Sequence, residues 1–100
     1  MFDAFAFRCC KKYQKEHPNV KLIFVTPYPN TEKDGYDAIL YPALEHVPRK
    51  FAISHRNRWM VENADFVVAY IDHAWGGAYQ TCMHAKREQK TIFYLNNKKF

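Results

Sequence analysis

The stretch DFVVAYIDHAWGG, residues 65–77, decides the fold. Residues 65–71 form a nearly continuous apolar run, which is typical of a strand buried on both faces of a parallel sheet. A turn with two glycines follows, and beyond it the sequence predicts a helix over 78–89 and a strand over 91–95. Strand, helix and strand in this order indicate a βαβ unit with a right-handed crossover.

A βαβ unit fixes how these strands should pair and what they should bury. We expect 65–71 and 91–95 to lie in parallel, because the helix between them carries the chain back to the same end of the sheet. Helices on both faces would then cover the central strand. Val67, Val68 and Ile92 are therefore expected to be almost wholly buried.

Upstream of this unit, the sequence predicts another helix and strand. Residues 2–17 place apolar side chains at helical spacing with lysines and Arg8 largely opposite, and Pro18 ends the helix. Residues 20–26 are a short apolar run rich in β-branched residues, which predicts a second buried strand. The chain therefore alternates between helix and strand as an α/β protein does.

The segment between the strand predicted over 20–26 and the strand predicted over 65–71 is harder to interpret. Four prolines punctuate residues 27–53, which we expect to be irregular apart from a helical turn or two between Asp37 and Leu44. Ser54 is a favourable N-cap residue and predicts a helix over 55–63. With 100 residues, we expect one domain spanning 1–100 with a mostly parallel sheet.

Composition limits the protein's class and partners. The 48% hydrophobic content excludes a disordered chain, and the net charge of +5 favours anionic partners, although clustered lysines are also typical of a solvated helix face. Cys9, Cys10 and Cys82 form no CxxC motif, so we expect reduced thiols and a cytoplasmic location. No segment reaches the ~20 apolar residues of a membrane span, so we expect no membrane partner.

The five histidines show neither HxxxH nor HExxH spacing. These are the spacings by which a helix presents two metal ligands on one face. The sequence therefore predicts no metal site, and we expect no bound cofactor.

The most informative candidate site is the turn at Trp75, Gly76 and Gly77. Ligands of parallel sheets bind outside the carboxyl ends of the strands, and a glycine pair lets a phosphate approach the backbone and the following helix N-terminus. Thr81, one helical turn further, could add a hydroxyl. The alternative interpretation is that the glycines only make a tight turn, since two glycines alone match neither a dinucleotide fingerprint nor a P-loop.

Polar side chains elsewhere add candidate ligand contacts. Arg56 and Arg58 carry planar guanidinium groups suited to phosphate, and Asn57 could bind a ribose or a base edge. At the first turn of a helix over 55–63 both arginines would oppose the macrodipole, which hints at an anion nearby. Asp72, at the end of the central strand, could hold a ribose hydroxyl or act as a base, or simply stabilise a turn.

Several of these motifs occur together in one known family. The combination of RNR at 56–58, the apolar strand, GGAYQT at 76–81 and KTI at 90–92 resembles the SLOG superfamily, particularly its YpsA-like branch. That superfamily also includes the Smf/DprA and LOG proteins. The resemblance covers nearly the whole chain. It implies a Rossmann-like three-layer α/β/α fold, a glycine turn that cradles phosphate and an RNR helix that lines the same pocket.

The sequence departs from this family pattern in two places. YpsA-like proteins usually begin with a strand ending in Gly-His-Arg, whereas this sequence starts in the helix that normally follows, so the resemblance implies an N-terminally shortened sheet. LOG enzymes use a glutamate one turn past their glycines, where this chain has Thr81-Cys82-Met83-His84. The resemblance therefore does not extend to LOG-type hydrolysis.

The expected function is binding of a nucleotide or nucleotide derivative by a sensor or accessory module. One alternative is a hydrolase or transferase acting on the N-glycosidic bond of nucleotides, with Asp72 or Glu62 as its carboxylate. Another is a DprA-like binder of single-stranded nucleic acid, suggested by the basic charge and the aromatic residues. A homodimer is a further expectation, because a missing strand would leave an open sheet edge.

Overall fold

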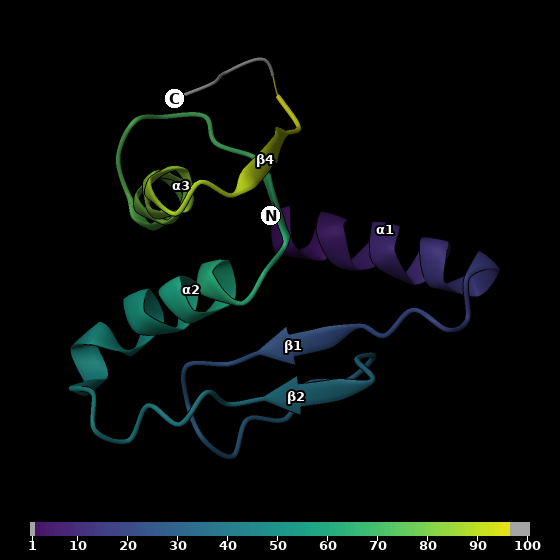
Figure 1. The fold of residues 1–100 in the computed structure, drawn as a ribbon. Coiled ribbons are helices and arrows are strands. Elements are labelled where there is room, and N and C mark those ends of the chain that lie inside the picture. The colour runs from purple at the N-terminus through teal and green to yellow at the C-terminus, as the bar shows by residue number, and fades with distance from the viewer. Residues whose placement is uncertain (1, 97–100) are drawn as a thin grey trace.

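The computed structural model describes residues 2–96, in which helices and strands alternate along the chain (Figure 1). In chain order the elements are α1 (Phe2–Glu16), β1 (Ile23–Val25), β2 (Ala38–Leu40), the 3-10 helix η1 (Arg49–Phe51), α2 (Ala52–Glu62), β3 (Phe66–Ala69), α3 (Gly77–Arg87) and β4 (Thr91–Tyr94). The predicted α/β class is confirmed. The three predicted helices and the three predicted strands are present, although the strands are shorter than expected.

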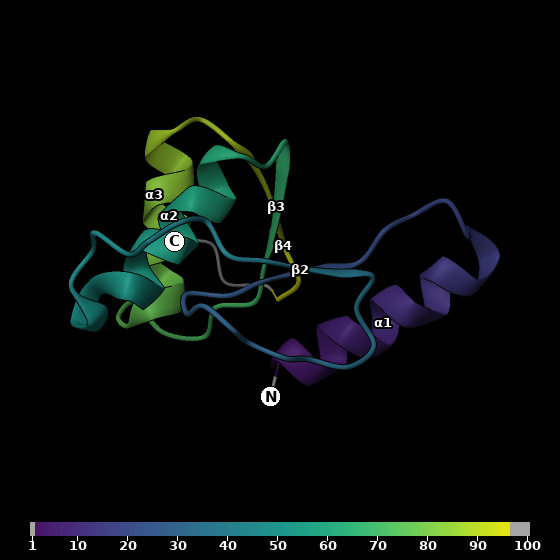
Figure 2. The same ribbon diagram turned by 90° about the horizontal axis from the view of Figure 1, so that it is seen from below.

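The strands form two parallel pairs instead of one sheet. β3 pairs with β4 in parallel, with Val67 opposite Ile92, as the βαβ unit predicted. β1 pairs in parallel with β2. Among residues 2–96, no strand joins these two sheets, and β3 and β4 run across the direction of β1 and β2 (Figure 2).

The predicted helical turns between Asp37 and Leu44 are wrong, because this segment holds β2. Residues 26–37 act as the crossover from β1 to β2, which is long enough to join parallel strands without a helix. Asp37 N–H bonds to Leu22 O at 2.8 Å as the pair begins. Pro42 also disfavours helical conformation in the residue before it, Tyr41.

The sheet of β3 and β4 (the second sheet) is covered by helices on one face only, so the burial expected for Val67, Val68 and Ile92 is wrong. α2 and α3 lie together on one side of β3 and β4 (Figure 2). Val67 and Ile92 are half-buried on this sheet, whereas Val68 is 56% exposed. The apolar core instead gathers around residues that include Val61, Ile71 and Ala85.

α2 starts earlier than predicted, and Ser54 does not cap it. The chain enters through η1, and Phe51 is the N-cap residue of α2. Ser54 lies inside the helix, where its Oγ donates a hydrogen bond to Phe51 O at 3.2 Å. Because η1 has already placed the chain in a helical path, the helix needs no side-chain cap at Ser54.

α1 packs against the loop before β2 through a face that the apolar pattern did not indicate. Phe7 contacts the Tyr36 ring at a centroid distance of 5.0 Å, and Gln14 Nε2 donates to Asp37 Oδ2 at 2.7 Å. Cys9 and Tyr13, on the predicted apolar face, are exposed. In the part of the chain that the structure describes, no helix is long and apolar enough to span a bilayer.

Candidate functional site

The two glycines of the predicted site differ in their backbone conformation. Gly76 is the N-cap residue of α3 with φ +91° and ψ 179°, a conformation that side chains other than hydrogen rarely tolerate. Its carbonyl accepts the first helical hydrogen bond, from Gln80 N–H, at 3.0 Å. A glycine is therefore required at position 76 by the turn itself.

Gly77 has no such structural requirement. It is the first residue of α3, and a Cβ built there would meet nothing within 4 Å. Glycine is a weaker helix former than alanine, so glycine at this position makes the helix less stable than alanine would, and it relieves no steric clash. The first turn of α3 also has no acidic residue, and Gly76 makes no side-chain capping hydrogen bond, so the positive end of the helix dipole faces the turn without a carboxylate from this helix.

A groove of about 440 Å³ opens beside Gly77. One wall is the strand segment from Phe66 to Ile71, and the other is formed by residues of α2 and of the first turns of α3. Apart from backbone groups, the lining is mostly apolar, and its side chains with polar oxygen or nitrogen atoms are those of Asn57, Tyr70 and Thr81. The Thr81 hydroxyl donates to Gly77 O at 2.8 Å, so its proton is used within the helix while the oxygen can still accept.

An aromatic pair lies in the turn that leads to the glycines. The rings of His73 and Trp75 stack with centroids 3.8 Å apart and planes 15° from parallel. His73 is also held by its neighbours, with Nε2 3.3 Å from Asp72 Oδ1 and Nδ1 2.8 Å from Trp75 O. Trp75 is 68% exposed, so the indole offers a held and accessible aromatic surface.

The structure brings only one residue of the RNR triplet to the groove. Asn57 lines it, whereas Arg56 and Arg58 do not. Arg56 Nη1 donates to Val25 O at 2.9 Å and its Nε donates to Asn57 Oδ1 at 2.8 Å, so this side chain links α2 to β1. Since α2 begins at Ala52, neither arginine lies in the first turn, and the expected conflict with the macrodipole is wrong.

The two candidate carboxylates lie at opposite ends of β3. Glu62 ends α2 just before the strand, and Asp72 follows the strand's carboxyl end. The strand between them is about 10 Å long at about 3.3 Å per residue. Neither carboxylate is among the groove-lining residues, so the structure does not bring them together for acid–base chemistry on one bond.

The floor of the groove includes a buried thiol with an aromatic partner. Cys82 Sγ lies 3.4 Å from the Tyr94 hydroxyl. This hydrogen bond, and to a lesser degree burial, raises the pKa of Tyr94 to about 12. Tyr94 therefore stays neutral over the physiological range.

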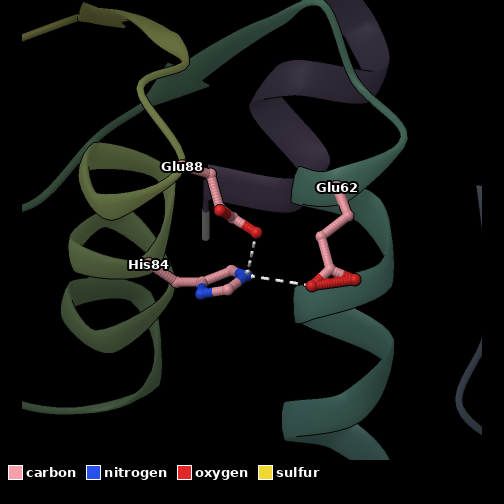
Figure 3. A group of neighbouring side chains, drawn as sticks. All are labelled: Glu62, His84 and Glu88. Carbon is pink, nitrogen blue, oxygen red and sulfur yellow. Dashed lines mark hydrogen bonds and ion pairs between the residues drawn. The ribbon is translucent and has the colours of Figure 1, made fainter.

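A second group of polar side chains was missed by the sequence analysis. Within residues 2–96, Glu62, His84 and Glu88 come together where α2 and α3 end (Figure 3). His84 and Glu88 are four residues apart on one helix, a spacing that could have suggested a ligand pair. Glu62 is 22 residues from His84, so no local pattern indicated that it would join them.

Comparison with known proteins adds no relative to this description. No family model matches the sequence, and neither a curated protein nor a solved structure matches the chain.

Proposed function

We propose that this protein binds a nucleotide or nucleotide derivative at the turn between β3 and α3. In this proposal it is a sensor or accessory module of the SLOG type acting in the cytoplasm. The phosphate lies on the N–H groups of α3, and the base and ribose extend into the adjoining groove.

The glycine at position 77 is the observation that carries the proposal. Gly76 is explained by its backbone conformation, but nothing in the fold explains Gly77. Open space at the missing Cβ, at the positive end of the α3 dipole, suits close approach by a phosphate oxygen. A glycine that the turn does not require therefore stands where an anion would bind.

The surroundings of Gly77 support a nucleotide over a simple anion. The groove volume lies within the range of about 300–1,000 Å³ that small-molecule sites occupy, and its apolar walls suit a base. Asn57 supplies an amide for polar contacts within the groove. The exposed indole of Trp75 offers a surface on which a base could stack.

A Rossmann-like sheet that lacks, within residues 2–96, a strand between β1 and β3 is the finer fold that we propose. Ala69 O accepts a hydrogen bond from the N–H of Leu95, just after β4. Because backbone groups point to alternate sides along a strand, the N–H and C=O groups of Val68 point to the edge of β3 away from β4. Thr26 N–H donates to Leu40 O, so the backbone of Val25 likewise faces away from β2, and on that side its carbonyl accepts a hydrogen bond from Arg56. A further parallel strand between β1 and β3 would join the two pairs into one sheet.

Calorimetric titration with adenine and guanine nucleotides, nicotinamide dinucleotide and ADP-ribose tests the proposal. We expect saturable binding of at least one of these compounds. Gly77→Ala should weaken it at least tenfold while raising stability by up to about 1 kcal/mol, because alanine favours helix and meets no neighbour. Gly77→Val should abolish binding.

The matched control is Lys12→Ala, an exposed lysine on α1 that should leave affinity unchanged. Failure of every compound against the wild-type protein, or equal binding by Gly77→Val, would contradict the proposal. Salt-dependent binding to single-stranded oligonucleotides alone would favour the nucleic-acid alternative instead.

A further inference from the structure

Glu62, His84 and Glu88 converge from two helices onto one point. Glu62 is the last residue of α2, while His84 and Glu88 lie one turn apart at the end of α3 (Figure 3). His84 Nε2 is 3.3 Å from Glu62 Oε2 and 3.9 Å from Glu88 Oε1. The three ligand atoms all lie within 4.8 Å of one another.

These distances are close to those of a three-ligand metal site. Zinc binds histidine nitrogen and carboxylate oxygen at about 2.0–2.2 Å, which places tetrahedral ligand atoms on the order of 3.3 Å apart. The Glu62–His84 distance already has this value. The His84–Glu88 distance is longer, at 3.9 Å. Because the Glu88 side chain is well exposed, a small rotation of its carboxylate brings its oxygen to the ligand spacing of zinc.

The charges around this cluster favour a cation. Glu62 and Glu88 each lie within ion-pair distance of His84, so one imidazole faces two carboxylates. Lys90 Nζ points instead to the main-chain oxygen of Glu62, at 3.5 Å. The C-terminal ends of α2 and α3, which carry the negative ends of their helix dipoles, also meet here.

We propose that Glu62, His84 and Glu88 bind a divalent first-row transition-metal ion of the zinc type. One imidazole nitrogen and two carboxylate oxygens suit such an ion, whereas magnesium and calcium prefer oxygen ligands alone. The bound ion ties the end of α2 to the end of α3, and water completes its coordination. This site is separate from the nucleotide groove and does not depend on the proposed function.

The test is zinc titration of untagged protein carrying Cys9→Ser and Cys10→Ser. These exposed thiols are removed because they would bind zinc themselves. We expect one zinc per chain, together with a zinc-dependent rise in melting temperature. Cobalt should give the absorption of a nitrogen and oxygen site without the intense thiolate band.

His84→Ala should lower zinc affinity at least tenfold and remove the rise in melting temperature. His55→Ala, an exposed histidine of α2 outside the cluster, is the matched control and should change neither. Glu88→Gln keeps the size of the side chain and serves if His84→Ala does not fold. It should also weaken binding.

Three outcomes would overturn the proposal. The first is the absence of saturable zinc binding up to on the order of 1 mM. The second is equal binding by the wild type, His84→Ala and Glu88→Gln. The third is cobalt binding with a strong thiolate band, which would place the metal on Cys82.

Discussion

At the scale of single residues, the two glycines after β3 show what a sequence motif can and cannot reveal. The motif marked the turn at the carboxyl end of the strand, and the structure has its turn there. It could not show that Gly76 adopts a positive φ while Gly77 is helical, because the letters are identical. Only the backbone separates the glycine that makes the turn from the one that the turn does not require.

Asp37 is a residue whose importance became visible only in the structure. Its carboxylate accepts hydrogen bonds from Leu22 N–H and Gln14 Nε2, both at 2.7 Å. The Leu22 backbone bond first, and the Gln14 bond second, hold the pKa of Asp37 below its usual value. Because the folded-state pKa is the lower one, the carboxylate stabilises the fold above the unfolded-state pKa and loses this effect as pH falls.

We expect Asp37→Asn to lower stability at neutral pH and to flatten the loss of stability on acidification between about pH 5 and pH 2. Urea unfolding at a series of pH values measures both effects. Asp34→Asn, in the same exposed loop, is the control and should behave as the wild type. Parallel pH profiles for the wild type and Asp37→Asn would show that these hydrogen bonds contribute nothing.

At the scale of elements, apolar runs predicted position well and burial poorly. All three predicted helices and all three predicted strands are present, because spacing and proline positions are local signals. β2 has only three residues, and its strand conformation depends on pairing with β1, so its own sequence gave no clear signal. Val68 belongs to a run typical of a two-sided interior strand, but only one face of β3 is covered.

The two faces of the segment around β3 should respond differently to charge. Val68→Asp should change the free energy of unfolding by less than about 1 kcal/mol, because Val68 is more than half exposed. Ile71→Asp should prevent folding, because Ile71 is 3% exposed and an unpaired buried charge costs several kcal/mol. Thermal melts of dilute protein compare the two variants, and equal loss of structure would mean that both faces are covered.

At the scale of the whole molecule, the chain exposes more surface than a compact monomer of its size. Its accessible surface is 7616 Å², whereas a folded monomer of 11.9 kDa exposes about 5,950 Å². The excess of about 1,700 Å² exceeds the ~800 Å² that each partner buries in a standard interface. The bare face of the second sheet contributes to it, with Phe66, Val68 and Phe93 all exposed.

We therefore expect the protein to self-associate at high micromolar concentration. The bare face carries no charge at these three positions, so two copies with a net charge of +5 can meet there without like charges in contact. Sedimentation velocity should show a dimer that weakens in Val68→Asp. A wild-type protein that stays monomeric over this range would show that the exposed face is tolerated in isolation.

The central claim is that a phosphate group lies on the N-terminus of α3 beside Gly77. Amide NMR spectra during titration with the best-binding nucleotide test it most directly, because they report the residues that the ligand contacts. We predict the largest shifts at the N–H groups of Gly77 and Ala78, with a smaller shift of the Asn57 side-chain amide. Unchanged signals at these positions, with shifts confined to the lysines of α1, would contradict the claim.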